Sequence, residues 1–282
     1  MDPFTAALEL MPQRYESALR AQAGNAPEEL RLRVGQPPSL LWGENEHFLS
    51  ADRVTGEDIA RVLEKATGAS LYSAAEAMRQ GYFCVGALRL GICGRVTAGG
   101  GGSGFASYSS LCIRLAREYR GICASFADRL CEGGFSNTLI VAPPGGGKTT
   151  ALRDLIRSLA DGGRRVGVID ERCEISGGVF DLGRCSDVIS GLDKLSAALL
   201  LLRSMDPQII ASDEISSPGD LNAIREIFGC GVGILASAHA AGREDLMKRG
   251  AYRALIGEGV FTRLLVIRRR GGKRSYALEA LA

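Results

Sequence analysis

The sequence predicts an α/β protein with two domains, a smaller N-terminal α+β domain and a second domain built on a parallel sheet. Two observations lead to this fold class. From Thr138 onward, short apolar runs alternate with stretches at helical spacing, which is typical of a parallel sheet covered by helices on both faces. Before residue 120, strand and helix patterns follow one another without that alternation. The length of 282 residues also fits two domains, which we place at 1–120 and 121–282.

The N-terminal domain is expected to begin with one amphipathic helix. Apolar residues recur there at helical spacing, at Phe4, Leu8, Met11, Tyr15 and Leu19. A capping-box pattern, which starts a helix, follows at Thr55 and again at Ser73, each with an acidic residue three positions later. Apolar runs and alternations predict strands at 30–34, 39–42, 47–49, 88–92 and 111–115, with a flexible glycine loop at 99–102.

The C-terminal domain is expected to alternate strands and helices along its whole length. The predicted ranges, beginning with a strand, are 138–142, 149–160, 166–170, 192–204, 208–213, 221–228 and 232–238. A basic cluster at 268–274 lies between two further strand patterns. We interpret it as a hairpin turn; the alternative is a contact with acidic lipid, nucleic acid or an acidic partner.

Composition disfavours several classes of protein. Lys and Arg number 34 against 32 Asp and Glu, a net charge of +2, which argues against general nucleic-acid binding. None of the eight cysteines forms a Cys-x-x-Cys pair, so zinc-finger and thioredoxin-like classes have no support. The first twenty residues lack the apolar core of a signal peptide. The longest apolar stretch, 195–202, is shorter than the roughly 20 residues that a membrane span requires. We therefore expect a cytoplasmic protein with no transmembrane segment.

A glycine-rich segment follows the first strand of the second domain. It fits the P-loop pattern of nucleotide-binding proteins, except that Ala142 replaces the usual first glycine. Glycines let the backbone turn its N–H groups toward phosphates, and the next helix directs its positive end to the same place. Lys148 is expected to bridge the β- and γ-phosphates of ATP, and the Thr149 hydroxyl to ligate Mg²⁺. The predicted nucleotide-binding residues are Ala142, Pro143, Pro144, Gly145, Gly146, Gly147, Lys148, Thr149 and Thr150.

The strand predicted at 208–213 ends in two carboxylates. Parallel strands present ligand-binding residues at their carboxyl ends, so Asp213 is expected to hold Mg²⁺. Glu214 is then placed to orient or deprotonate the attacking water. The alternative for both residues is a solvated acidic pair that begins a loop.

Two other strand ends carry candidate residues. Glu171, in Asp170-Glu171-Arg172, is expected to position the metal or the water without binding it directly. The alternative is a surface turn. His239 follows the strand at 232–238, where a neutral imidazole would sense the γ-phosphate. A structural histidine with satisfied hydrogen bonds is the alternative for His239.

These motifs, in this order, resemble the stage III sporulation protein AA family of endospore-forming bacteria, itself similar to the ATPases of type II and type IV secretion systems. The likeness covers about 70–270. It rests on the segments A-P-P-G-G-G-K-T-T, V-I-D-E-R-C-E-I, R-S-M-D-P-Q-I-I-A-S-D-E-I, S-A-H-A and F-T-R-L-L-V-I-R-R. In the N-terminal half, G-A-L-R-L-G-I-C-G-R and C-I-R-L-A-R-E look like arginine-bearing strands of that family.

The resemblance implies a RecA-like P-loop NTPase domain and a homo-oligomeric, hexameric ATPase motor. Such a motor would work at the cytoplasmic face of a secretion-like membrane channel, in the mother cell of a sporulating bacterium. The range 170–174 corresponds to the family's acidic box and His239 to its histidine box. The arginines that match residues able to reach a nucleotide from the preceding domain or a neighbouring subunit are Arg89, Arg95, Arg114 and Arg117. For each arginine the alternative is a solvated strand face or a structural ion pair.

The sequence departs from the family pattern at three positions. Ala142 replaces glycine, Leu88 stands where histidine is expected, and Ser212 interrupts the apolar run before Asp213. Two other functions stay open: a nucleotide-gated scaffold with negligible hydrolysis, and a RecA-like nucleic-acid ATPase. The near-neutral charge and the lack of a basic groove studded with aromatic residues disfavour the second.

Overall fold

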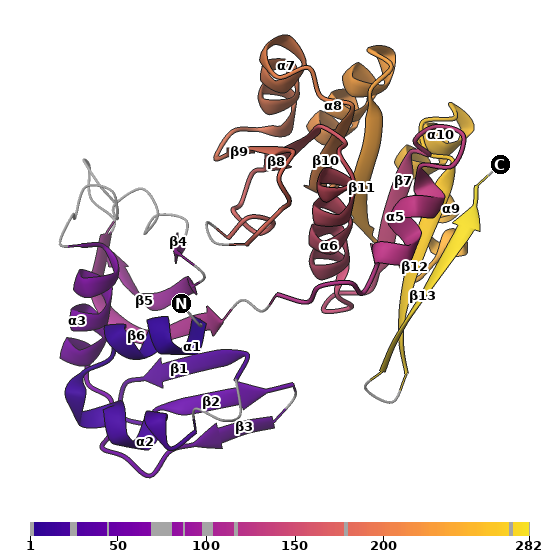
Figure 1. The fold of residues 1–282 in the computed structure, drawn as a ribbon. Helices are drawn as coiled ribbons and strands as arrows, with labels where there is room; N and C mark the ends of the chain where they lie inside the picture. The colour runs from indigo at the N-terminus through magenta and orange to yellow at the C-terminus, as the bar shows by residue number, and fades with distance from the viewer. Residues whose placement is uncertain are drawn as a thin grey trace. The chain divides into compact units, whose positions relative to one another are not determined.

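The computed structural model divides the chain into two compact units, Met1–Arg117 and a second unit that starts at Glu118 (Figure 1). Each unit has a hydrophobic core of its own. The residues that the structure describes are 3–22, 27–43, 45–68, 81–86, 88–97, 104–115, 118–177, 180–270 and 273–281. The capping-box pattern at Ser73, the glycine run at 99–102 and Arg117 lie outside these residues.

The described part of the first unit is a six-stranded antiparallel sheet with helices packed against it. The strands run in the order β3-β2-β1-β6-β5-β4. Their bounds are Glu29–Arg33 for β1, Ser39–Trp42 for β2, Asn45–Phe48 for β3, Tyr82–Val85 for β4, Leu88–Thr97 for β5 and Gly104–Leu115 for β6. The capping box at Thr55 is confirmed at the start of α3 (Gly56–Ala66): the Thr55 hydroxyl accepts from the Asp58 N–H, and the Asp58 carboxylate accepts from the Thr55 N–H.

The prediction of one helix over the first twenty residues is wrong. The segment forms α1 (Pro3–Leu10), a 3₁₀ turn η1 (Gln13–Tyr15) and α2 (Glu16–Arg20). Pro12 separates them: its backbone is extended, with ψ of 138°, and a proline disfavours helical geometry at the residue before it. The apolar residues that gave the helical pattern are all buried in one core nevertheless. The hydrophobic pattern thus identified the buried residues correctly but missed the break in the helix.

The second unit contains a seven-stranded sheet in the order β13-β12-β7-β11-β10-β8-β9. All neighbouring strands are parallel except β12 and β13, which form an antiparallel hairpin. The strand bounds are Thr138–Ala142 for β7, Val166–Asp170 for β8, Ser186–Ser190 for β9, Ile209–Glu214 for β10, Gly233–His239 for β11, Arg263–Arg270 for β12 and Lys273–Ala280 for β13. The predicted parallel sheet is confirmed.

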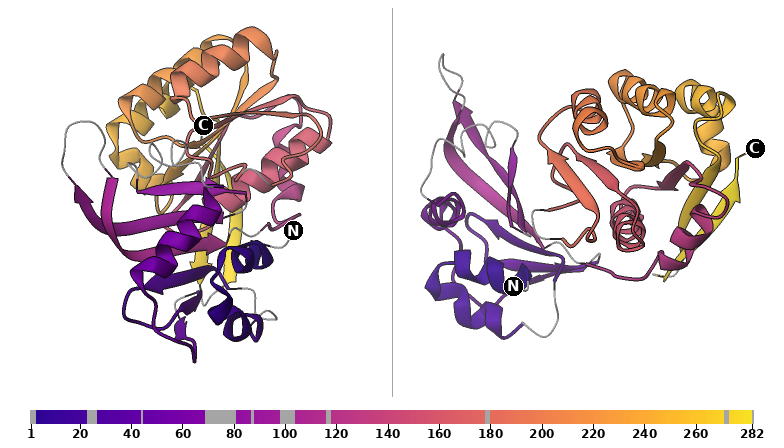
Figure 2. Two further views of the ribbon diagram at one scale, coloured as in Figure 1. Left: turned by 90° about the vertical axis from the view of Figure 1, so that its left-hand side faces the viewer. Right: turned by 45° about the horizontal axis from the view of Figure 1, so that its top comes forward.

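Helices cover both faces of this sheet (Figure 2). Alternate residues of β7 show this division: Leu139 and Val141 pack in one core with α7 and α8, whereas Ile140 packs in the other with α5 and α6. The helix bounds are Ala124–Leu130 for α5, Lys148–Asp161 for α6, Lys194–Ser204 for α7, Pro218–Gly229 for α8, Arg243–Lys248 for α9 and Gly250–Gly257 for α10. In the part of the chain that the structure describes, none of the helices has the length and apolar character needed to cross a membrane.

The parallel arrangement brings the predicted site residues to one edge of the sheet. The carboxyl ends of β7, β8, β10 and β11 meet there, since these strands are neighbours and run in the same direction. The glycine-rich loop follows β7, Asp170 ends β8, Glu214 ends β10 and His239 ends β11.

Candidate functional site

The glycine-rich loop joins β7 to α6, as the sequence predicts. Gly145 and Gly147 have φ values of 69° and 99°, a left-handed conformation that only glycine adopts without strain. A Cβ atom on Gly146 would come within 2.6 Å of the Ala142 Cβ. Ala142 is fully buried beneath the loop, so its small side chain fits the position where the pattern has glycine. Thr149 and Thr150 lie half-buried in the first turn of α6.

Lys148, His239 and Glu214 form a continuous chain of contacts beside this loop. The Lys148 Nζ lies 2.7 Å from His239 Nδ1 and 3.3 Å from His239 Nε2, and His239 Nε2 lies 2.9 Å from Glu214 Oε2. Burial lowers the pKa of Lys148, and the nearby charge of Glu214 opposes that effect. Three residues predicted from separate motifs are therefore in direct contact.

Asp213 precedes Glu214 in the sequence and lies at an irregularity in β10. The pairing of β10 with β11 shifts between Ser212 and Glu214, which leaves Asp213 as the extra residue of a bulge. Such bulges redirect side chains next to functional sites. Burial raises the pKa of Asp213 to about 6, an effect that nearby Lys194 opposes. Among the described residues, the buried Ser212 Oγ atom has no hydrogen-bond partner, whereas Asp213 Oδ1 lies 3.0 Å from the Lys194 ammonium.

Lys194 is a residue of the site that sequence reasoning missed. It begins α7, is 6% exposed, and its Nζ lies 2.9 Å from Glu171 Oε2 and 3.0 Å from Asp213 Oδ1. Burial by itself would lower the pKa of Lys194, but hydrogen bonding and charge from these acids raise it above its usual value. Lys194 thus neutralises an acidic cluster that consists of Glu171, Asp213 and Asp220. In the sequence it appears only as the polar start of a leucine-rich helix.

Two buried side chains fix the conformation of the acidic segment after β8. Asp170 accepts hydrogen bonds from the backbone N–H groups of Ile175 and Ser176, at 2.9 and 2.7 Å. The Arg153 guanidinium of α6 donates to the Ile175 carbonyl over 2.8 Å, and burial lowers its pKa to about 10. Asp170 therefore shapes the turn, and Glu171 is the residue of this segment that contacts Lys194 in the acidic cluster.

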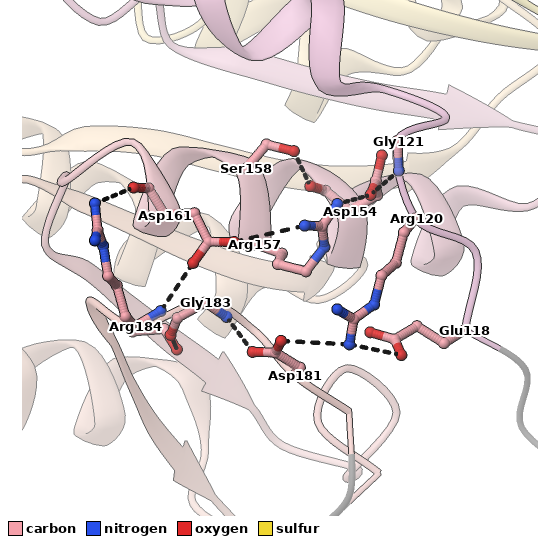
Figure 3. Close-up of polar contacts among 11 residues, drawn as sticks. Glu118, Arg120, Gly121, Asp154, Arg157, Ser158, Asp161, Asp181, Gly183 and Arg184 are labelled. Carbon is pink, nitrogen blue, oxygen red and sulfur yellow. Dashed lines mark hydrogen bonds and ion pairs between the residues drawn. The ribbon is translucent and has the colours of Figure 1, made fainter. Parts of the chain in front are cut away.

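A second buried carboxylate of α6 holds the start of the second unit. Asp154 accepts hydrogen bonds from the backbone N–H groups of Gly121 and Cys123, both over 2.7 Å, and pairs with Arg157 at 2.8 Å (Figure 3). Its side chain has no solvent exposure. The segment that leads into α5 is thereby fastened to the helix that follows the glycine-rich loop.

Asp154→Asn is expected to lower the free energy of unfolding by about 2 kcal/mol, because one of the two backbone N–H groups loses its acceptor and the bond to Arg157 weakens. Asp161→Asn is the matched control. It removes a partly exposed charge that also faces Arg157, at 3.5 Å, and is expected to cost less than about 1 kcal/mol. Urea unfolding of both variants measures the difference. Equal losses would contradict the role of Asp154.

Arg89 and Arg114 lie side by side in the first unit, directly opposite one another on β5 and β6. Both have local partners: Arg114 Nε is 3.1 Å from Glu29 Oε1, and the Arg89 guanidinium stacks over the Tyr82 ring at 4.3 Å. Leu88, at the position where the pattern has histidine, is buried in the core. Arg95 is exposed on β5.

The fold defines the class to which the chain belongs, an α/β protein with the architecture of known ATPases. It superimposes on the ATPase DotB of Legionella pneumophila with a TM-score of 0.63 at 13% identity, covering 95% of this chain and 81% of that one. It superimposes on the pilus retraction motor PilT, solved with bound ADP, with a TM-score of 0.62 at 16% identity, covering 92% and 80%. At these identities the likeness concerns the fold alone.

Sequence comparison identifies the family. The model of the family "Sporulation stage III, protein AA" matches residues 19–276. Stage III sporulation protein AA of Bacillus subtilis (strain 168) is 34% identical over 279 residues, which cover 94% of this chain and 91% of that protein. The chain belongs to the sporulation stage III protein AA family, which confirms the resemblance inferred from the motifs.

Proposed function

We propose that this protein binds ATP with Mg²⁺ and hydrolyses it. The contact chain Lys148–His239–Glu214 beside the glycine-rich loop is the observation that carries the proposal. The proposal is supported by the proximity of a cation suited to phosphate, an imidazole and a carboxylate suited to activate water. Lys148 exchanges His239 for the phosphates when nucleotide binds. His239 then reports the γ-phosphate, and Glu214 orients or deprotonates the attacking water.

The residues present also fit a magnesium ion. Asp213 offers a buried carboxylate at the end of β10, paired with the Lys194 ammonium at 3.0 Å, and Mg²⁺ prefers oxygen ligands. Thr149 and Asp213 would hold the ion, which neutralises charge on the transferred phosphoryl group. Lys194, which also pairs with Glu171, would hold the Asp213 carboxylate in place.

We extend the proposal to the assembly on the basis of family membership and the ATPase-like fold. The protein acts as a homo-oligomeric motor, a hexamer, at the cytoplasmic face of a secretion-like membrane channel in the mother cell. Arg89 and Arg114 approach a nucleotide from the N-terminal domain or a neighbouring subunit, exchanging their local partners for phosphate.

Calorimetric titration of the full-length protein with ATP and ADP in millimolar magnesium tests the binding step. Heat of association is expected for both nucleotides, and its absence from folded protein would refute the proposal. Phosphate release measured over a protein concentration series, with native mass determination, tests the motor. Turnover that rises as subunits associate is expected; tight binding with negligible turnover at every concentration would identify a nucleotide-gated scaffold instead.

A further inference from the structure

The basic hairpin formed by β12 and β13 reaches past the end of the strand that carries the glycine-rich loop. The parallel pairing of β12 with β7 ends with Val266 opposite Val141, and β7 itself ends one residue later. β12 continues to Arg270, so its last residues lie beyond the carboxyl end of β7 (Figure 1). The basic residues of the hairpin are therefore at the same edge of the sheet as the loop.

Strand alternation places Arg269 and Arg274 on the face of the sheet that α6 covers. Ile267 and Tyr276 are a cross-strand pair, and both pack in the core formed with α5 and α6. Arg269 and Arg274 are the next pair on that face, one step of two residues toward the hairpin tip. The glycine-rich loop leads into α6, so these two arginines lie on the loop's side of the sheet.

Arg274 lies directly against the loop. Its Nε atom is 3.0 Å, and its Cδ atom 3.4 Å, from the position that a Cβ on Gly147 would occupy. Gly147 is the residue immediately before Lys148, in the left-handed conformation that turns the loop into α6. A guanidinium at this place is within side-chain reach of a phosphate held by the loop.

The charges around Arg274 favour an anionic ligand. Its cross-strand neighbour Arg269 carries the same charge, and like charges directly opposite one another destabilise a strand pair. By contrast, Arg268 on the other face pairs with Glu279 at 3.3 Å. Within the residues that the structure describes, the Arg274 side chain makes no hydrogen bond or ion pair.

We propose that Arg274 is a phosphate-binding residue of the nucleotide site, supplied by the C-terminal hairpin of the same chain. The inference rests on the proposed function and adds to it a second cation beside Lys148. Arg274 has five fixed N–H donors and binds phosphate oxygens through two of them at once. Strand β13 would thereby contribute one phosphate contact to the site formed by the loop.

Calorimetric titration with ATP and ADP tests this proposal in the full-length protein. Arg274→Ala is expected to weaken binding about tenfold and to reduce its dependence on salt, because one charge-assisted contact to phosphate is lost. Lys273→Ala is the matched control: it removes the same charge from the neighbouring residue, which faces the other side of the hairpin, and is expected to change affinity less than about twofold. Arg274→Lys is expected to recover part of the affinity and most of the salt dependence.

The outcomes separate this inference from the proposed function. Equal affinities for Arg274→Ala and Lys273→Ala, with wild-type protein binding nucleotide, would overturn the role of Arg274 and leave the ATPase proposal intact. Failure of the wild-type protein to bind nucleotide would refute the ATPase proposal itself. Mixing Arg274→Ala with Lys148→Ala subunits tests whether the contact lies within one chain. No recovery of tight binding is expected, and recovery would overturn that assignment.

Discussion

Lys148→Ala is expected to weaken ATP binding by more than about a hundredfold, whereas Glu214→Gln is expected to bind ATP like the wild-type protein and to lose turnover by about 10²–10³-fold. In the proposed mechanism Lys148 is the cation that contacts the phosphates, so its loss would remove an interaction made on binding, before any reaction. The Glu214 carboxylate contacts His239, 2.9 Å away. Replacing that carboxylate by an amide of the same shape would remove the proposed base for the attacking water.

Binding measured by calorimetry and turnover measured by phosphate release together separate the two roles. Lys248→Ala and Glu226→Gln, exposed substitutions of the same kinds on α9 and α8, are the matched controls and are expected to leave both quantities unchanged. If Lys148→Ala and Glu214→Gln lose binding to the same extent, the division of roles between them is wrong.

Lys194→Met is expected to lower the free energy of unfolding by about 3–5 kcal/mol, the cost of removing one partner from a buried group of charges. The Lys194 ammonium is surrounded by Glu171, Asp213 and Asp220, the last at 3.7 Å. Methionine fills a similar volume but leaves these acids facing one another without a cation. Urea unfolding monitored by circular dichroism measures the loss.

The double variant Lys194→Met with Asp213→Asn provides the control for this prediction. Removing the acid together with the lysine relieves part of the repulsion, so the double variant is expected to be more stable than Lys194→Met alone. Lys248→Met, at an exposed position, is expected to change stability by less than about 0.5 kcal/mol. A loss for Lys194→Met as small as that for Lys248→Met would show that Lys194 does not stabilise the acidic cluster.

The elements of the second unit could be predicted from local patterns because each depends on a short stretch of sequence. The glycine-rich loop is an example, since Gly145 and Gly147 have positive φ values that favour glycine. The parallel topology then places Glu214 and His239 at the same edge without further information. The first helix was mispredicted because Pro12 breaks the backbone geometry without interrupting the apolar spacing.

Lys194 and Asp154 could not be predicted, because their roles depend on contacts between distant parts of the chain. Lys194 contacts acids from the segment after β8, from β10 and from α8, and no local pattern distinguishes it from a solvated lysine at a helix start. Asp154 occupies an ordinary position within an amphipathic helix, and its two backbone partners lie about thirty residues earlier. Buried charges of this kind are recognised only once the packing of the fold is known.

The bonds from Asp154 to the amides of Gly121 and Cys123 also supply a natural spectroscopic probe. The exchange of these two amide protons with deuterated solvent requires the carboxylate of α6 to release them. Their exchange rates therefore report how often the Asp154 carboxylate separates from these two amides. A ligand that stabilises this contact will slow the exchange of both protons without touching them.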